Sequence, residues 1–191
     1  MNLNINKGLV FFLFILVPFI GRAAPPEWQI DPSQSSLSFT ATQNGAPVSG
    51  QFKTFTGEIF VDPANYKASS VHIVIDMSTI TTDYADVKTT LITPDWFNVK
   101  VFPKAEFKST EFNKTGDNTY QAIGNLTIRD KTVPVTLSFT TEQPSSDTGI
   151  VTGNTVLKRN VFGVGQGEWS STDQVKNDVK VDFKIVAKRK I

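Results

Sequence analysis

Apolar and polar residues alternate along much of the chain after residue 27, which is the pattern of strands that have one buried and one exposed face. Turn residues such as Asn44-Gly45 and Asp62-Pro63 separate the runs. About eight such strands, mostly joined as hairpins, predict a closed antiparallel barrel or a sandwich. The alternation is clearest in residues 36–42, 55–61, 69–76, 104–109, 120–128, 133–139, 151–159 and 179–187.

A short helical insertion is predicted at about residues 81–98, where the period of two is lost. In its first part, Asp83 is the expected N-cap and Asp86 follows three residues later. Its second part begins at Thr93-Pro94, which suits a helix start, and places Trp96-Phe97 on a helical turn. The insertion therefore brings two large aromatic side chains to one end of the predicted sheet.

Two details of the strand pattern are specific enough to test. Phe52 and Phe55 are three residues apart instead of two, which predicts a bulge near Lys53-Thr54. After Pro103 the alternation resumes, and it places Ala105 and Phe107 on the buried face of a strand whose other face is charged.

The first 23 residues have the pattern of a secretory signal peptide. Lys7 precedes an apolar run from residue 9 to residue 20, and Gly21-Arg22-Ala23 supplies the small residues that precede cleavage. The run is short for a membrane span, so we expect cleavage after Ala23. Residues 24–191 then form a single domain in the periplasm or outside the cell.

Composition narrows the function further. The 15 Phe among 191 residues predict a large, dry interior, and the absence of Cys excludes disulfides and thiolate metal sites. Without residues 1–23 the chain has 17 basic and 18 acidic residues, a net charge of −1. A nearly neutral chain is a poor partner for nucleic acid.

Catalytic and metal-binding groups are few. His72 is the only histidine, and the alternation places it on the outer face, so we expect neither catalysis nor a metal site. The glycines of residues 163–167 are better explained by a tight turn than by a phosphate loop, because no helix follows. Arg159 shares the inward face with Leu157, where it would form an ion pair or meet a polar ligand group.

Several segments together match one family pattern. They are Trp28-Gln29-Ile30-Asp31 with Ser36-Leu37-Ser38-Phe39, residues 50–59, Leu91 through Ser109, Gly124 to Arg129 with Thr132 to Val135, and Arg159 to Val164. On these residues the chain resembles the YceI-like family, described as lipocalin-like polyisoprenoid-binding proteins. The resemblance covers residues 24–191 nearly from end to end, and it departs at Ser35 and Val161, where the family often has His and Asp.

The resemblance implies an eight-stranded, lipocalin-like antiparallel barrel without catalytic activity or cofactor. Its long pore would hold the tail of an isoprenoid such as a polyprenyl diphosphate or a ubiquinone-type quinone, for transport, storage or stress response. The alternative is a non-catalytic module with a filled barrel that docks to a membrane redox or stress-response partner. A homodimer and a transient membrane contact stay open.

The expected ligand-binding residues are the inward-facing apolar side chains together with Arg159, and Trp96 and Phe162 are expected near a mouth of the pore. The same side chains would also suit the core of a filled barrel. The complete set is Leu37, Phe39, Phe52, Ile73, Trp96, Phe97, Phe107, Leu126, Leu137, Leu157, Arg159, Phe162 and Phe183.

Overall fold

The computed structural model describes residues 24–190. The predicted signal peptide, residues 1–23, lies outside the described residues, so its cleavage after Ala23 stays a prediction. Among residues 24–190, none of the helices is long and apolar enough to cross a membrane.

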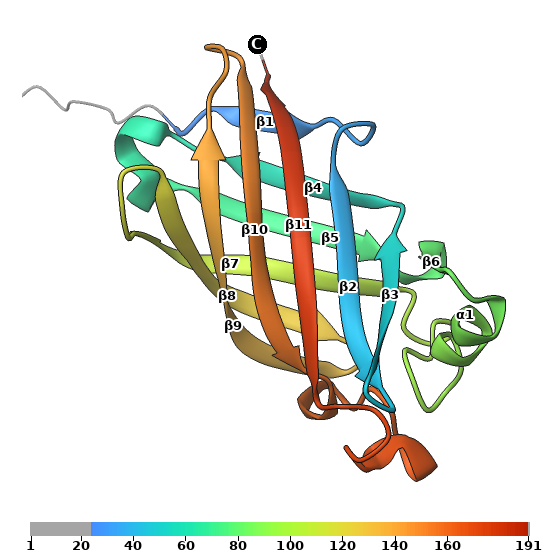
Figure 1. Cartoon of the computed structure of the whole chain (residues 1–191). Coiled ribbons are helices and arrows are strands. Elements are labelled where there is room, and N and C mark those ends of the chain that lie inside the picture. Colours follow the sequence, from blue (N-terminus) through green and yellow to red (C-terminus); the bar gives the residue numbers. More distant parts are fainter. Residues whose placement is uncertain (1–23, 191) are drawn as a thin grey trace, which may run out of the picture.

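Within the described residues, eleven strands form one antiparallel sheet (Figure 1). Strand β1 pairs with both β4 and β11, and this double pairing closes a ring of eight strands in the order β1-β4-β5-β7-β8-β9-β10-β11. The predicted eight-stranded antiparallel barrel is therefore confirmed. The strands are β1 (Glu27–Ile30), β2 (Ser36–Gln43), β3 (Ala46–Phe52), β4 (Phe55–Phe60), β5 (Ser70–Asp76), β6 (Ile80–Thr82), β7 (Lys104–Lys114), β8 (Thr119–Ile128), β9 (Lys131–Glu142), β10 (Thr148–Lys158) and β11 (Asp178–Arg189).

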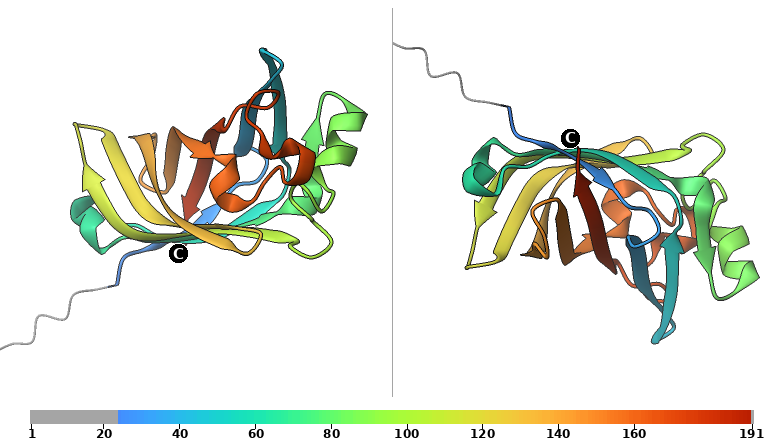
Figure 2. Two further views of the ribbon diagram at one scale, coloured as in Figure 1. Left: turned by 90° about the horizontal axis from the view of Figure 1, so that it is seen from below. Right: turned by 90° about the horizontal axis from the view of Figure 1, so that it is seen from above.

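Strands β2, β3 and β6 extend the sheet beyond this ring. Strand β11 pairs with β1 through residues 187–189 and with β2 through residues 180–184, so the sheet divides along β11. In Figure 1, β10, β11 and β2 cross β4, β5 and β7 at a steep angle. Figure 2 looks at the molecule from below and from above, and in both views the strands curl around one interior.

Short helices cover the ends of the barrel. Their bounds are η1 (Pro63–Ala68), η2 (Met77–Thr79), α1 (Ala85–Leu91), η3 (Arg159–Phe162) and η4 (Gly167–Ser170). The predicted insertion is present as α1, but its N-cap is Tyr84, which makes no side-chain capping bond, instead of Asp83. The helical turn predicted at Trp96-Phe97 is not a helix. Residues 92–101 form a series of turns, in one of which the Trp96 amide donates to the Thr93 carbonyl at 3.1 Å.

The predicted bulge near Lys53-Thr54 is also wrong. The chain changes partners at this point, because β3 pairs with β2 and β6 whereas β4 pairs with β1 and β5. The loss of period thus marks a corner between two parts of the sheet. The register between β7 and β8 does shift between Ser109 and Glu111, as at a β-bulge.

Two hairpin turns show why the strands reverse where they do. Asn44 and Gly45, between β2 and β3, have φ values of 50° and 81°, the left-handed backbone that a two-residue hairpin turn requires. Arg129, which follows β8, also has a positive φ of 58°. Pro134 lies in the part of β9 that pairs with β8 alone, as expected for a residue without an N–H.

The outer face of the barrel is charged where the pattern predicted it. On β7, Ala105 and Phe107 are buried, whereas Glu106 reaches His72 of the neighbouring β5 at 3.1 Å. Hydrogen bonds from His72, and to a smaller extent from Lys108, hold the pKa of Glu106 below its usual value. His72 therefore lies on the outer face, away from the interior.

Candidate functional site

The barrel encloses an apolar cavity of about 270 Å³. Ser38, Thr155 and Arg159 are polar, and all other described residues of its wall are apolar or aromatic. A volume of this size is close to the lower end of the range for small-molecule pockets. The alternative of a filled barrel required side chains to occupy this space, whereas the structure leaves it open.

All thirteen side chains expected to bind a ligand lie in the wall of this one cavity. They come from distant parts of the chain, and it is the inward alternation of the strands that brings most of them together. The set is Leu37, Phe39, Phe52, Ile73, Trp96, Phe97, Phe107, Leu126, Leu137, Leu157, Arg159, Phe162 and Phe183.

Other wall residues were missed. Met77, Leu91 and Val175 complete the wall from short helices and loops, where no alternation marks the inward face. Phe55, at the start of β4, was on a predicted inward face but was not chosen as a ligand contact. If every inward-facing apolar residue of the strands had been chosen as a ligand contact, Phe55 would have been included, but the loop residues would not.

Glycines beside three of the phenylalanines explain how a Phe-rich interior stays open. A Cβ on Gly124 would lie 2.6 Å from the Phe107 ring, and a Cβ on Gly153 would lie 2.6 Å from the Phe183 ring. The ring of Phe39 occupies the same kind of space over Gly50. Each ring therefore lies against the backbone of a neighbouring strand, and less of it projects across the cavity.

Gly124→Ala should destabilise the barrel by about 1–3 kcal/mol, the usual cost of overpacking. The new methyl group would lie 2.4 Å from the Lys108 carbonyl as well as against the Phe107 ring, and a carbonyl in a strand ladder cannot move aside freely. Urea unfolding of the mutant measures the effect.

Gly149→Ala is the matched control, because its methyl group would meet only the Trp28 ring at an ordinary 3.5 Å. We expect this variant to be neutral or slightly more stable, since alanine restricts the unfolded chain. Equal losses in the two variants would show that close packing of Phe107 over Gly124 is not what sets the stability there.

Arg159 is held differently from either expectation. It is only 3% exposed, and its five N–H groups donate to backbone carbonyl oxygens, without a carboxylate partner among the described residues. Burial lowers the pKa of its guanidinium group from the ordinary value. The predicted ion pair is therefore wrong, and no donor is left for a ligand group. The acceptors are the carbonyls of Val164, Gly165, Ser171, Val175 and Lys176, at 2.7–3.2 Å.

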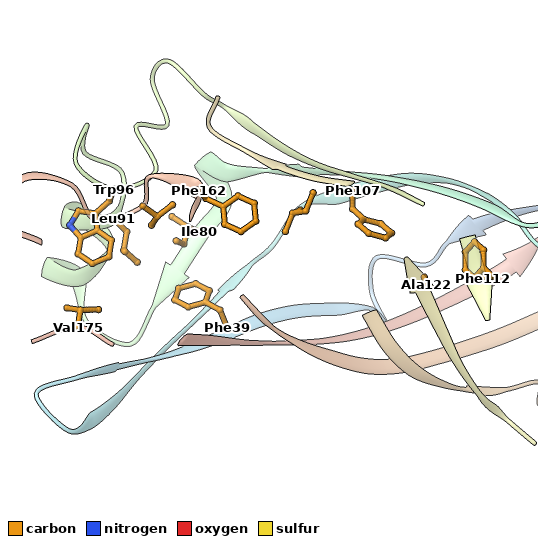
Figure 3. Close-up of a cluster of buried hydrophobic side chains, with 11 residues drawn as sticks. Phe39, Ile80, Leu91, Trp96, Phe107, Phe112, Ala122, Phe162 and Val175 are labelled. Carbon is orange, nitrogen blue, oxygen red and sulfur yellow. The ribbon is translucent and has the colours of Figure 1, made fainter. Parts of the chain in front are cut away.

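Large aromatic side chains lie at the α1 end of the cavity. Trp96 is 7% exposed and Phe162 1%, so both residues that were expected near a mouth are buried (Figure 3). Trp169 of η4 packs on Trp96 with ring centres 5.5 Å apart. Arg129 ties the covering segments together, donating to the Trp96 carbonyl at 2.5 Å and the Gly163 carbonyl at 2.7 Å.

A second cavity, of about 190 Å³, lies toward the other end of the barrel. Tyr66 and Ser69 from η1 and its C-cap, and Tyr120 from β8, line it. Nothing in the alternation pattern predicted η1, which has no buried residue, so this cavity was not predicted. Its wall shares Ile59, Phe139, Val151 and Ile185 with the first cavity.

The chemistry available inside the barrel is burial of apolar surface. Among residues 24–190, no group of three or more His, Asp or Glu side chains is arranged to hold a metal ion. The single histidine is on the outer face, where it meets Glu106. The interior can therefore exclude water from an elongated apolar molecule, and its polar groups are confined to a few positions.

Comparisons with known proteins agree with this architecture. The family model described as "YceI-like domain" matches residues 28–187. A UPF0312 protein of Yersinia pestis is 35% identical over 137 residues, which cover 70% of this chain and 71% of that protein. The crystal structure of BcnA from Burkholderia cenocepacia has a TM-score of 0.79 and 32% identity, covering 82% of this chain and 98% of BcnA.

A polyisoprenoid-binding domain from Saccharophagus degradans shares the fold, with a TM-score of 0.67 and 13% identity over 86% of this chain and 99% of that domain. Because the family model spans nearly all of the described residues and a relative above 30% identity covers most of the chain, the comparisons agree with the resemblance seen in the sequence. The chain belongs to the YceI-like domain family.

Proposed function

We propose that this protein is a non-catalytic carrier that holds a long isoprenoid lipid inside its barrel, in the periplasm or outside the cell. The observation that carries the proposal is the apolar cavity, into whose wall all thirteen expected contact residues converge. The similarity of fold to a polyisoprenoid-binding domain supports the same class of ligand.

The physical basis is the burial of hydrocarbon. Each methylene group removed from water contributes about 0.8 kcal/mol, so roughly ten buried groups contribute about 8 kcal/mol before the cost of ordering the tail. Binding to a wall with so few polar side chains gains this energy without specific hydrogen bonds. It discriminates by length and shape, which suits a repeating isoprenoid tail.

The proposal includes no catalytic step. General acid–base chemistry needs a titratable group within reach of the substrate, and Arg159, the one charged side chain in the described wall of the first cavity, is committed to five carbonyls. The proposal also needs neither a second copy of the chain nor contact with a membrane.

Mass spectrometry of the protein from the periplasmic fraction of its own host tests the proposal. The protein is purified without detergent, its intact mass is measured, and an organic extract is analysed for lipids. We expect a polypeptide beginning at Ala24 and a polyisoprenoid in roughly equimolar amount. An extract without lipid, together with a co-purifying protein, would contradict the carrier and favour an accessory module instead.

A further inference from the structure

We propose that the ligand enters and leaves the barrel through the second cavity, past a flap formed by residues 62–69, which contain η1. This inference rests on the proposed function and deepens it by locating the ligand's route. Four residues, Ile59, Phe139, Val151 and Ile185, belong to the walls of both cavities, so a molecule that enters the second can continue into the first. In Figures 1 and 2, η1 lies at the end of the molecule opposite α1, so the route begins at that end.

Exposed residues mark the rim of the second cavity. Pro63 of η1, Glu142 at the end of β9 and Gln143 in the loop that follows are all exposed and line this cavity. The described wall of the first cavity, in contrast, contains only buried and half-buried residues. The second cavity therefore has its rim at the surface, between η1 and the end of β9.

The base of the flap is fixed in the sheet. Phe60 and Ser70, which precede Val61 and follow the flap, are partners in the ladder between β4 and β5. The Val61 amide donates to the Pro26 carbonyl at 3.0 Å, and the Val61 carbonyl accepts from Nε1 of Trp28 at 2.9 Å. The chain therefore leaves the sheet and rejoins it at neighbouring points, as the two ends of a hinged segment do.

Beyond this base the flap is held by local bonds. The Asn65 amide donates to the Asp62 carbonyl at 2.9 Å, and the Ala64 amide donates to the Asp62 carboxylate at 2.9 Å. The Ser69 amide donates to the Tyr66 carbonyl at 3.0 Å. Within residues 24–190, no hydrogen bond of the flap reaches another element, and η1 has no buried residue. The flap can therefore move as a unit without breaking a hydrogen bond to the barrel.

Tyr66 is the contact that holds the flap closed. Its ring meets the Tyr120 ring edge to face with the centres 5.6 Å apart, and Tyr120 stacks on Phe139 at 5.9 Å. Phe139 belongs to the walls of both cavities, so this row of three rings leads from the flap to the passage between them. One edge-to-face pair is a weak tie, which breaks and re-forms readily. When the flap opens, Tyr66 leaves the wall of the second cavity and clears the route.

The α1 end is tied more firmly. There Trp169 packs on Trp96 with the ring centres 5.5 Å apart. Hydrogen bonds between separate segments add to this contact, because the Asp95 carbonyl accepts the amides of Gly165 and Gln166 at 2.8 and 2.7 Å. Opening this end would break such bonds, whereas opening the flap leaves its own bonds intact. The two ends therefore offer matched aromatic pairs with different restraints.

Exchange kinetics with Tyr66 variants test the route. The mature chain, stripped of lipid, is mixed in a stopped-flow instrument with retinol, a fluorescent isoprenoid alcohol, and the association and dissociation rates are measured. Tyr66→Ala should raise both rates by at least about fivefold and leave their ratio nearly unchanged, because a gate sets a barrier shared by entry and exit. Tyr66→Phe keeps the ring and should keep the original rates.

Trp169→Ala is the matched control, since it removes one ring of the aromatic pair at the α1 end. We expect it to leave both rates unchanged. Faster exchange in Trp169→Ala but not in Tyr66→Ala would overturn the inference, as would a change in the dissociation rate alone, which marks Tyr66 as an ordinary ligand contact. In either case the carrier itself stands. If retinol does not bind at all, the proposed function is contradicted together with the route.

A bulky label provides an arm that leaves the interior unchanged. The sequence contains no Cys, so a single introduced cysteine can be labelled with a polyethylene glycol maleimide. The label on Gln143→Cys, at the rim, should slow retinol entry by about tenfold or more. The label on Lys100→Cys, an exposed position in the turns that follow α1, should have no effect. Equal slowing by both labels, or slowing by the second alone, would overturn the inference.

Discussion

Phe107→Asp should abolish the co-purification of an isoprenoid lipid with this protein. Phe107 lies in the wall of the first cavity and is 5% exposed, so an aspartate there would place a carboxylate against the lipid tail. Burying an unpaired charge costs several kcal/mol, which is comparable to the energy gained from several methylene groups. The measurement is the amount of lipid extracted per mole of folded protein.

Val156→Asp is the matched control for this change. Val156 is also an apolar residue of a barrel strand, but it is 55% exposed on β10, so an aspartate there meets water. We expect this variant to retain its lipid. Undiminished lipid in Phe107→Asp would place the lipid elsewhere.

An uncharged variant separates the loss of the cavity from the loss of the fold. Ala122 is 4% exposed and lies in the cavity wall on β8, so Ala122→Trp fills part of the lumen with apolar atoms. We expect a folded barrel with little lipid and a stability loss of about 1–3 kcal/mol from overpacking. Full lipid retention by this variant, with its strand content unchanged by circular dichroism, would also contradict the assignment of the cavity.

Arg159→Met should lower the free energy of unfolding by about 3–5 kcal/mol, the size of effect seen when a buried charged partner is removed. Methionine fills a similar volume but leaves five carbonyls without their donor, and each buried unpaired carbonyl carries a cost. The loops that cover the α1 end of the cavity converge on this guanidinium. Denaturant unfolding monitored by tryptophan fluorescence measures the loss.

Two further substitutions test whether the guanidinium group itself, and not merely a positive charge, is required. Arg159→Lys should recover little stability, because one ammonium group cannot reach five carbonyls in the way that a planar guanidinium does. Lys158→Met is the control: Lys158 is the preceding residue and forms an exposed pair with Asp178, so its loss should cost less than about 1 kcal/mol. Similar losses for Arg159→Met and Lys158→Met would refute the structural role given to Arg159.

The barrel itself was predictable because its information is local. Alternation on β7, β8, β9, β10 and β11 identifies the inward face wherever one face of a strand is buried, and the contact residues follow from that face. The closure of the sheet into a barrel could not be predicted from this alternation. It depends on the pairing of the four-residue strand β1 with both β4 and β11, and no pattern in so short a strand specifies two partners.

The errors arose where distant contacts override local pattern. The break between Phe52 and Phe55 is the same in sequence for a bulge and for a corner, and only the partners of β3 and β4 distinguish them. The environment of Arg159 depends on carbonyls up to 17 residues away, and the segment that supplies the nearer ones contains glycines with left-handed backbone. The second cavity was missed because η1 has no buried residue to mark it.

A crystal structure of the protein purified with its native ligand tests the central claim most directly. We predict one continuous, elongated feature of electron density inside the barrel, running from Phe162 past Phe139 to the second cavity, which Tyr66 and Tyr120 line. A barrel whose interior is completely filled by its own side chains, with no elongated space for a tail, would contradict it.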